Sequence, residues 1–546
     1  MEIRIRIRKH LVIAIAAFLL SSGFRIYDEL FEYSKNLEIF SAAYKEVGKN
    51  FVDEQDPGKL MRKGLDAMLA SLDPYTNYYS ESQAEEALMD RQGEYSGMGC
   101  RVILRKNYPV VSEVFGGYAF SKADIRPGDI LKTLSGQDMR NKTISDVSLF
   151  LRGATNTDVA VTIVREGISM DKNVTRLQVR SKNVPFFGMA DEQTGYIKLE
   201  TFGQNCASEI QNALVSLNKD GKMKYAVLDL RENGGGLLHE AVGIVGLFTG
   251  QGKLVVNMKG RTPGSNKEWI TPSASAFTGL PLAVLVNNHS ASASEVVSGS
   301  LQDMDRAVIV GRNSFGKGLV QNYFQLPYRT QMKITTAKYY TPSGRCIQLL
   351  DYSHRNADGS VGSVPDSLKK AFKTNNGRKV FDGGGIRPDL MVDEFAGQPL
   401  LKVMNDELML FDYANHYRNT HESIASAKDF KLNKDEIDQF IEETSTALNK
   451  IILEKLKKNM SQSLGDTTLA NSIIERAGLY ASLKTEISEK LKAFKKPITY
   501  RLQQEILQRF YFDDALYESS FVGDPDLETA LNVLHDGAKY QKILQP

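Results

Sequence analysis

The chain has 546 residues, and at about 100–200 residues per domain this length predicts roughly three or four domains. Hydrophobic residues make up 42% of the chain, which excludes a wholly disordered protein. The 68 Lys and Arg nearly balance the 66 Asp and Glu, which argues against a globally basic nucleic-acid-binding protein. The three cysteines, Cys100, Cys206 and Cys346, lie 106 and 140 residues apart, so we expect neither a zinc–cysteine site nor a disulfide-dense scaffold.

Residues 1–24 are typical of a targeting segment. A positive flank that begins at Arg4 precedes the apolar run Leu11–Leu20, and the small residues Ser21 and Gly23 follow it. The run is shorter than the about 20 apolar residues that span a bilayer, so it fits a signal peptide with a cleavage site before Phe24. An uncleaved signal anchor and a buried N-terminal element of the mature fold are the alternatives. Either targeting outcome places most of the chain across a membrane.

A helical N-terminal region is predicted over residues 25–90. Its apolar periodicity runs from about Ile26 to Leu72 and ends at the breaker dipeptide Asp73-Pro74. The following Gly-rich stretch, up to about residue 400, contains apolar runs that predict strands. These runs are Val159–Val164, Ala226–Leu230, Leu282–Val286 and Ala307–Val310.

Residues 91–170 contain a regular succession of turns and strands. The Gly-spaced turn Ser96-Gly97-Met98-Gly99 leads into a predicted strand, and the turn Arg126–Asp129 separates two more. The expected elements in this stretch are strands at Cys100–Leu104, Val110–Val114, Ile130–Leu134 and Val159–Arg165, and a helix at Thr143–Arg152.

This order resembles a PDZ domain. The resemblance implies that the backbone N–H groups of Ser96, Gly97, Met98 and Gly99 bind the terminal carboxylate of a peptide, which adds a strand to the sheet edge. A small β-barrel with ordinary tight turns is the alternative. The run "GGYAFSKADIRPGD" departs from the small-residue "AxxAGL" pattern that such modules have at this place.

A glycine-rich segment follows the predicted strand Val227–Arg231. Three consecutive glycines, of which Gly235 is the second, precede a helix-like run that begins at Leu237. Glycines before a helix leave backbone N–H groups open to a ligand, which suits half of an oxyanion hole. A phosphate-binding nest and a flexible turn are the alternatives.

Ser292 lies between a predicted buried strand, Pro281–Val286, and an apolar helical segment, Val296–Leu301. A serine at such a turn lies where unpaired N–H groups and the positive end of a helix dipole suit a developing oxyanion. The spacing of Ser292 and Glu295 also fits a capping box, which is the structural alternative. A histidine base is a further alternative, but His289 lies on the same turn, where reaching back to Ser292 is difficult.

Lys317 lies in a segment with two competing interpretations. The run Gly311–Lys317 fits the P-loop pattern, but Gly318 replaces the required Ser or Thr, and the following residues predict a strand where a P-loop needs a helix. The other interpretation makes Lys317 a general base, whose pKa must fall by about 3 units to act at neutral pH. Apolar neighbours and the absence of a carboxylate within six residues suit that requirement.

The last part of the chain, 396–546, is predicted to be a helical domain. Residues 401–546 carry only 4 of the 43 glycines, and apolar residues recur there at helical spacing. We expect this domain to carry no chemistry, and we interpret it as a dimerisation platform.

Three motifs in this order, "VLDLRENGGG", "VNNHSASASEVVSGSLQD" and "GRNSFGKGLVQ", resemble the carboxyl-terminal processing peptidases. These are serine peptidases with a Ser/Lys dyad and an inserted PDZ domain. The resemblance covers about two-thirds of the chain, from Leu37 to Val392, and includes "GYIKLETF", "YYTPSGRCIQ" and "GIRPD". The family's usual "RNNPGG" is "RENGGG" here, which keeps the N–H donors but loses a proline.

The resemblance implies a role for each matching residue. Ser292 would be the nucleophile, Lys317 the base, and Gln321 the group that orients the lysine. The N–H groups of Ala293 and Gly235 would form the oxyanion hole. Arg165 would relay peptide binding to the dyad, whereas Asp303 is interpreted as structural.

The expected fold is a multidomain α+β chain in which a PDZ domain, 91–170, is inserted in a mixed α/β protease core, 171–395, between helical terminal regions. The expected function is that of an endopeptidase on the periplasmic side of a bacterial cell envelope, secreted or anchored in the inner membrane. It would cut proteins or peptides with accessible C-termini, without metal, cofactor or nucleic acid. The alternatives are a non-catalytic PDZ scaffold with a degenerate protease core and a P-loop nucleotidase.

Overall fold

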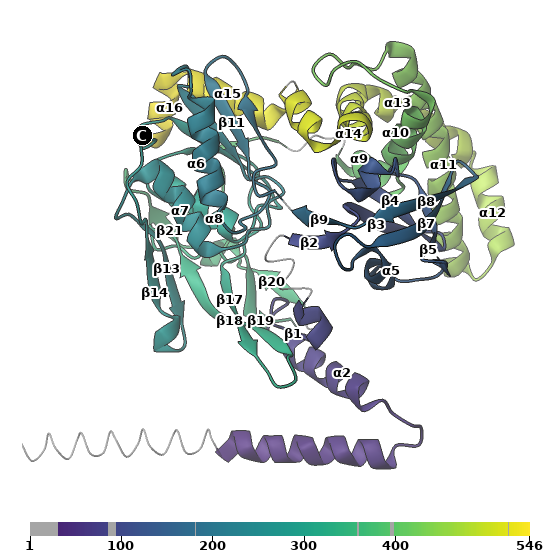
Figure 1. The fold of residues 1–546 in the computed structure, drawn as a ribbon, viewed down its shortest axis with the longest axis horizontal. Helices are drawn as coiled ribbons and strands as arrows, with labels where there is room; N and C mark the ends of the chain where they lie inside the picture. Colours follow the sequence, from purple (N-terminus) through teal and green to yellow (C-terminus); the bar gives the residue numbers. More distant parts are fainter. Residues whose placement is uncertain are drawn as a thin grey trace, which may run out of the picture.

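The computed structural model describes residues 31–85, 94–180, 182–356, 360–393, 398–521 and 523–545, so the predicted targeting segment of residues 1–24 lies outside it. The fold is mixed α/β. Two bodies lie side by side, and a helix over residues 31–50 extends away from them (Figure 1). One body contains two sheets and the predicted catalytic segments, and the other contains a smaller sheet against a group of helices.

The centre of the first body is a six-stranded sheet of order β10-β11-β12-β15-β16-β23. Its strands from β11 to β23 are parallel, and β10 is antiparallel to β11. The strands predicted within 226–230, 282–286 and 307–310 are confirmed as its central members. The strand bounds are β10 Phe186–Met189, β11 Thr194–Lys198, β12 Tyr225–Asp229, β15 Leu282–Val286, β16 Val308–Gly311 and β23 Leu390–Met391.

Helices cover both faces of this sheet, which explains why its strands are apolar without alternation. In β15, Leu282, Val284 and Val286 pack with helices α6 (Cys206–Leu217), α7 (Leu238–Thr249) and α8 (Ala293–Asp303). The intervening Ala283 and Leu285 pack against α15 (Pro525–His535) and α16 (Gly537–Leu544) on the opposite face. Helices α15 and α16 are therefore part of the core of the first body.

The second sheet of this body has the order β1-β18-β13-β14, and β17 also pairs with β18. The residues after Lys317 form β17, a strand, as predicted, so the P-loop interpretation fails. The bounds are β1 Asn77–Tyr79, β13 Leu254–Gly260, β14 Lys267–Ile270, β17 Leu319–Gln325 and β18 Gln331–Tyr340; two short hairpins follow, β19 Leu350–Arg355 with β20 Val361–Ser363 and β21 Ala371–Lys373 with β22 Lys379–Phe381.

The small-sheet domain, residues 94–180, contains the strands and the helix that were predicted for residues 91–170. Its sheet has the order β3-β4-β5-β7-β8, and β6 pairs with β5. The domain extends beyond the predicted boundary at residue 170. Strand β8 ends at Thr175, and β9, which follows it, pairs with β2 at the start of the domain. The bounds are β2 Glu94–Gly97, β3 Cys100–Arg105, β4 Tyr108–Val114, α4 Ala119–Lys122, β5 Ile130–Leu134, β6 Gln137–Asp138, α5 Ile144–Leu151, β7 Asp158–Arg165, β8 Ile168–Thr175 and β9 Leu177–Arg180.

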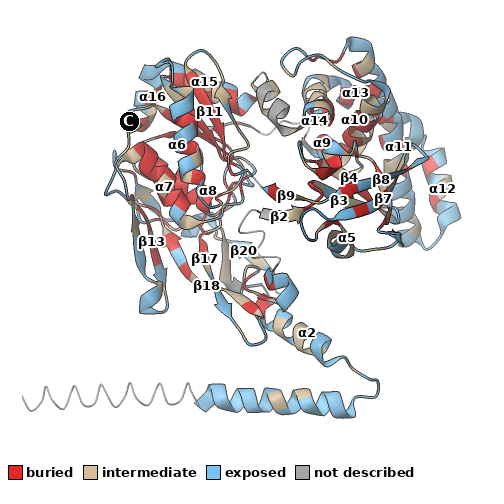
Figure 2. Ribbon diagram, viewed as in Figure 1, coloured by how far each residue is buried: buried red, intermediate tan, exposed pale blue. Residues whose placement is uncertain are grey.

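The helical stretch expected over residues 26–72 is interrupted. One helix covers 31–50, and α2 (Pro57–Ala70) follows it after a gap. Asp56 caps α2 by accepting the Lys59 N–H at 3.1 Å, and Pro57 occupies its first position, where a missing N–H costs nothing. The helix over 31–50 is largely exposed (Figure 2). Across the described ranges, the search for a helix long and apolar enough to cross a bilayer finds none.

The helical lobe, residues 398–521, packs around an apolar core of its own, which includes Leu448, Leu491 and Leu502. It contacts the small-sheet domain, where Arg105 forms a bidentate ion pair with Asp412 at 2.5 and 2.6 Å. The predicted helical domain of 396–546 is thus divided between the two bodies. Helices α9 to α14 lie with the small-sheet domain, and α15 and α16 pack on the six-stranded sheet. The bounds are α9 Gln398–Asp406, α10 Met409–Thr420, α11 Lys434–Leu464, α12 Thr467–Arg476, α13 Leu479–Ala493 and α14 Lys495–Ser520.

Candidate active site

The three predicted catalytic segments follow three adjacent parallel strands. The loop with Gly235 follows β12, the turn with Ser292 follows β15, and the loop with Lys317 follows β16. The order β12-β15-β16 in the sheet brings them to one edge, although they lie far apart in the sequence. The carboxyl edge of a parallel sheet is where α/β proteins commonly bind ligands.

Ser292 has a backbone conformation that L-residues rarely adopt, with φ 58° and ψ −113°. Such a strained turn between a strand and a helix is typical of a nucleophilic serine. The Ser292 N–H donates to Glu295 Oε2 at 2.8 Å, so this part of the predicted capping box is present. The Tyr339 hydroxyl contacts the Ser292 side chain and donates to the Lys317 carbonyl oxygen, which places these two segments against each other.

Gly235 lies directly against the serine turn. A Cβ atom on Gly235 would lie 2.8 Å from Ser292 Cβ and 3.0 Å from the Ala293 nitrogen, and its φ is 104°, so the position requires glycine. The Gly235 N–H donates to Asn233 Oδ1 at 2.9 Å. The Ala293 N–H has no acceptor among the described residues. Of the two N–H groups predicted for the oxyanion hole, that of Ala293 is therefore free among the described residues, and that of Gly235 is hydrogen-bonded to Asn233.

Lys317 is partly buried and has the surroundings of a lysine that can lose its proton. Burial lowers its pKa, the nearby charge of Lys333 lowers it further, and Glu295 and Asp73 act in the opposite direction. Its Nζ lies 4.6 Å from the centre of the Tyr75 ring. The hydrogen bonds and ion pairs of the described residues include none between Lys317 Nζ and a carboxylate, and none between Nζ and Ser292.

Glu295 joins the serine turn to the lysine loop. Its side chain is fully buried on α8, and its Oε1 accepts from Ser314 Oγ at 2.5 Å and from the Gly316 N–H at 2.7 Å. Its Oε2 accepts the N–H of Lys317 at 2.9 Å and that of Ser292. Burial raises the pKa of Glu295, and these four donors oppose the rise. The sequence offered only the Ser-x-x-Glu spacing, which fits a capping box.

Gln321 and Arg165 form hydrogen bonds with residues outside the predicted dyad. The Gln321 amide donates to Thr335 Oγ1 at 3.2 Å, and the bonds between described residues include none from Gln321 to Lys317. Arg165 forms a bidentate pair with Asp129 at 2.7 and 2.8 Å, and it also binds Asp124, so it is held within the small-sheet domain. The hydrogen-bond partner of Gln321 thus lies on β18, and the bidentate partner of Arg165 lies on the turn before β5.

Asp303 has the structural role that we expected, because its carboxylate binds the buried Arg345 at 2.8 Å. Neither of the two histidines near the site, His239 and His289, forms a hydrogen bond with Ser292 among the described residues. His239 lies beside Glu240, and its side chain is 58% exposed. The histidine-base alternative therefore has no geometric support.

The predicted peptide-binding turn borders a cavity of about 280 Å³ between the start of β3 and α5. Met98, Val102, Ile144 and Leu151 give it apolar walls, and Arg101 and Arg152 lie at its margin. Within the described chain, the N–H groups of Met98 and Gly99 donate to no acceptor. The Ser96 Oγ is buried without a hydrogen-bond partner in the structure.

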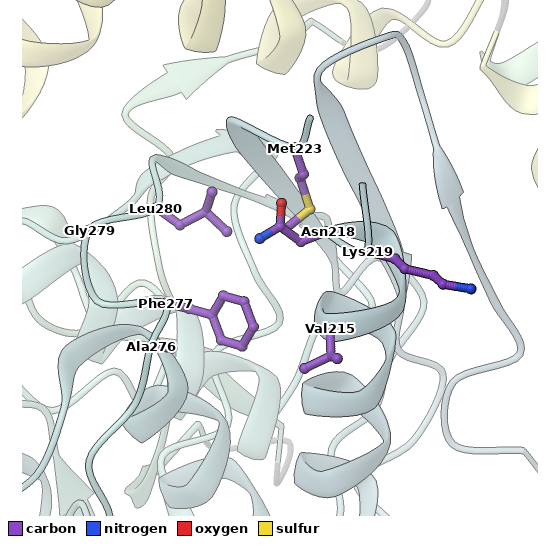
Figure 3. Close-up of a pocket in the computed structure, with 8 residues that line it drawn as sticks. All are labelled: Val215, Asn218, Lys219, Met223, Ala276, Phe277, Gly279 and Leu280. Carbon is purple, nitrogen blue, oxygen red and sulfur yellow. The ribbon is translucent and has the colours of Figure 1, made fainter. Parts of the chain in front are cut away.

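A larger cavity, of about 490 Å³, lies between the end of α6 and the loop at residues 276–280 (Figure 3). Its lining includes Val215, Met223 and Phe277 but none of the predicted site residues. The described residues contain no group of three or more His, Cys, Asp or Glu side chains placed to hold a metal ion.

Comparison with known proteins identifies the family. The profile described as "Peptidase family S41" matches residues 193–351, and "Probable PDZ-protease, C-terminal helical domain" matches residues 400–534. The chain is 32% identical to a carboxy-terminal-processing protease of Bartonella bacilliformis, over 58% of this chain and 73% of that protein. It is 28% identical to a probable CtpA-like serine protease of Staphylococcus aureus, over 78% of this chain and 83% of that protein.

Among solved structures, the photosystem II D1 C-terminal processing protease aligns with 26% identity and a TM-score of 0.36, over 65% of this chain and 92% of that chain. The sequence relationship to the Bartonella protein extends over most of that protein's length. The chain thus belongs to peptidase family S41, the carboxy-terminal-processing proteases.

Proposed function

We propose that the protein is a serine endopeptidase in which Ser292 is the nucleophile and Lys317 is the general base. The observation that carries this proposal is the double attachment of Glu295, which holds the backbone of Ser292 and of Lys317 with one buried carboxylate. Because a carboxylate fixes both segments, their side chains are presented from a common rigid frame. The family assignment supports a peptidase, and the strained turn at Ser292 supports the identity of the nucleophile.

The reaction would follow acyl-enzyme chemistry. Neutral Lys317 takes the proton from the Ser292 hydroxyl as Oγ attacks the peptide carbonyl carbon. The resulting oxyanion accepts hydrogen bonds from the Ala293 N–H and, once Asn233 Oδ1 is displaced, from the Gly235 N–H. The Lys317 ammonium then gives its proton to the departing amine. Water hydrolyses the ester in a second step, with Lys317 again acting as the base.

The lysine must be neutral for this role, which requires a fall in its pKa of about 3 units, or about 4 kcal/mol. Partial burial and the nearby Lys333 act in the required direction. A substrate lying over the site would exclude more water and lower the pKa of Lys317 further.

We further propose that the small-sheet domain is a PDZ domain that binds the C-terminus of the substrate. The support is the pair of free N–H groups at Met98 and Gly99 beside the apolar cavity along α5. Two free N–H donors suit a terminal carboxylate, and apolar walls suit an apolar last residue. The order of the β-strands around α5 also agrees with the resemblance that the sequence carries.

The partners would be proteins or peptides with accessible C-termini. The basic, apolar segment of residues 1–24 supports a place on the periplasmic side of the cell envelope, with or without retention in the membrane. The helical lobe would also serve as a surface for self-association. Its exposed Leu469, Ile473 and Tyr480, on α12 and α13, support this role.

The direct test is cleavage of an unstructured peptide with an apolar C-terminus. Ser292→Ala and Lys317→Ala should each lower the rate by about a thousandfold or more while the thermal unfolding transition is kept. Lys338→Ala, which removes an exposed lysine of β18, is the matched control and should leave the rate unchanged. Full activity in either dyad variant would overturn the mechanism.

Peptide binding is tested separately on Ser292→Ala, which cannot consume its ligand. A peptide with a free C-terminal carboxylate should bind at least tenfold more tightly than the same peptide with a C-terminal amide. Equal binding would contradict the PDZ proposal. Binding without cleavage by the unaltered chain would instead favour the non-catalytic scaffold.

A further inference from the structure

The turn at residues 73–76 lies beside the catalytic lysine, although the sequence marked it only as the end of a helical stretch. Asp73 is buried, and its Oδ1 accepts the N–H groups of Tyr75 and Thr76, each at 2.8 Å. Strand β1 follows directly and pairs with β18, with Asn77 opposite Lys333. Tyr75 is therefore held on both sides of its backbone and cannot move away from the site without breaking these bonds.

The ring of Tyr75 faces the Lys317 ammonium position. Nζ lies 4.6 Å from the ring centre, a distance at which a cation is attracted to an aromatic face. Tyr352 packs against Tyr75 edge-on, with ring centres 6.2 Å apart and planes at 86°. Burial raises the pKa of Tyr75 above its ordinary value, so its hydroxyl stays neutral and the contact with Lys317 is not an ion pair.

Other charged and titratable groups face Lys317 from several elements. These are Lys333 and Tyr339 on β18, Glu295 on α8, and Asp73 on the turn itself, with Tyr352 behind Tyr75. The ion pairs of the described residues include none between these carboxylates and Nζ. A carboxylate in contact with Nζ would keep the lysine protonated, whereas an aromatic face stabilises the ammonium more weakly. That weaker contact suits a lysine that must lose and regain a proton in each cycle.

We propose that Tyr75 is a positioning residue of the dyad, whose ring orients Lys317 and stabilises the ammonium that forms when Ser292 loses its proton. This inference rests on the proposed function of Lys317 as the base. It gives the N-terminal region a part in catalysis that neither the family match nor the sequence motifs assign.

The test compares two replacements at Tyr75 in the full chain. Tyr75→Phe keeps the ring and should change kcat by less than about twofold. Tyr75→Leu keeps an apolar side chain without a ring face and should lower kcat about tenfold with little change in KM. Because loss of the ring disfavours the ammonium, the acidic limb of the pH profile of kcat/KM should move to lower pH in Tyr75→Leu alone. A role in packing alone would lower the rate without moving this limb.

Tyr79→Leu is the matched control, because the Tyr79 ring lies 5.7 Å from Nζ of Lys333, a lysine without a proposed proton-transfer role. It should leave kcat and the pH profile unchanged. If Tyr75→Leu unfolds, Tyr75→Trp supplies the second test, since a larger ring face should keep the activity and move the acidic limb to higher pH.

Several outcomes would overturn the inference. They are equal profiles for Tyr75→Leu and the unaltered chain, an unmoved acidic limb in Tyr75→Leu, and a loss in Tyr75→Phe as large as that in Tyr75→Leu. Lys317→Ala in the same assay separates the two hypotheses. An active Lys317→Ala variant would refute the dyad itself, whereas an inactive one beside an unaffected Tyr75→Leu would refute only the role of Tyr75.

Discussion

The helical lobe (398–521) and the C-terminal segment (523–545) are consecutive in the chain and both helical, yet they belong to different parts of the molecule. The lobe has its own apolar core and lies against the small-sheet domain. The segment has no separate core, because its apolar residues fill one face of the protease sheet. Composition and helical periodicity alone do not distinguish the two.

The two regions also differ in how charge holds them. The lobe meets the small-sheet domain through Arg105 and Asp412, whose side chains are 39% and 44% exposed. In the C-terminal segment, the Asp526 side chain is 4% exposed and binds both Arg231 at 3.0 Å and Arg312 at 2.9 Å. Asp524 binds Arg231 as well, at 2.7 Å.

These two arginines begin the loops that carry the predicted site. Arg231 follows β12 and precedes Gly235, and Arg312 follows β16 and precedes Lys317. The carboxylate of Asp526 thus links two loops that flank the serine turn. The difference teaches that residues 523–545 support the edge of the sheet where the proposed site lies, whereas the helical lobe supports the domain expected to bind peptide.

The largest expected effect is that of ending the chain after residue 521. This change uncovers the side of the sheet on which Leu527, Val533 and Leu534 are now buried. Each large apolar side chain of this kind contributes about 1.5–3 kcal/mol, and whole domains are stable by only about 5–15 kcal/mol. We expect the protease core to unfold or aggregate, as measured by soluble yield and thermal unfolding.

The control for this truncation is Leu448→Ala, which creates a cavity in the core of the helical lobe of the full chain. It should destabilise the lobe and leave the unfolding of the protease core unchanged. A truncated chain whose protease core melts like that of the full chain would show that both regions are appendages.

A smaller effect is expected when one charge is removed from each region. Asp526→Asn removes a buried carboxylate that two partly buried arginines share, which costs about 3 kcal/mol and should also lower kcat, because both loops lose their link. Asp412→Asn breaks a half-exposed pair and should cost about 0–1 kcal/mol without affecting kcat. Chemical denaturation and steady-state kinetics measure both. Similar losses in the two variants would contradict the distinction between the regions.

An effect smaller than that of Asp526→Asn concerns the pH dependence of stability. Burial by itself raises the pKa of Asp229, but Arg231 and Lys198 more than offset this, so the pKa lies well below its ordinary value. Its stabilising contribution is complete above the unfolded value near 4 and is lost as pH falls towards the depressed native value. The full chain should therefore lose about 2 kcal/mol more than Asp229→Asn between pH 5 and pH 2.

Thermal unfolding at each pH measures this slope. Because Arg231 also binds Asp524, the slope reports on the junction between the protease sheet and α15. An identical slope in Asp229→Asn would show that the charges at this junction do not contribute to acid unfolding.

Much of the local structure followed from the sequence. The apolar runs at 282–286 and 307–310 became central strands because parallel strands are buried on both faces. Gly318 and the strand-forming residues after Lys317 excluded a P-loop, and β17 confirms that prediction. The motifs around Ser292 and Lys317 were sufficient to identify the family.

Other features depended on contacts between distant segments. Glu295 holds a loop that lies about 20 residues further along the chain, and the spacing to Ser292 revealed only its helix-capping half. Gln321 was expected to orient Lys317 and Arg165 to relay peptide binding, whereas their side chains bind Thr335 and Asp129. Sequence motifs assign residue types to a site, whereas the partner of a long polar side chain is decided by which donors and acceptors the fold places within reach.

The sequence by itself predicted the central strands and the residues proposed for catalysis, and it was sufficient to identify the family. Only the tertiary structure placed Tyr75 over Lys317 and divided the C-terminal helices between two bodies. The physical reason is the same in both cases. The apolar face of an amphipathic helix or of an aromatic ring tends to be buried against other residues, because apolar surface is unfavourable in water. What covers it depends on which surfaces the topology of the sheets brings together.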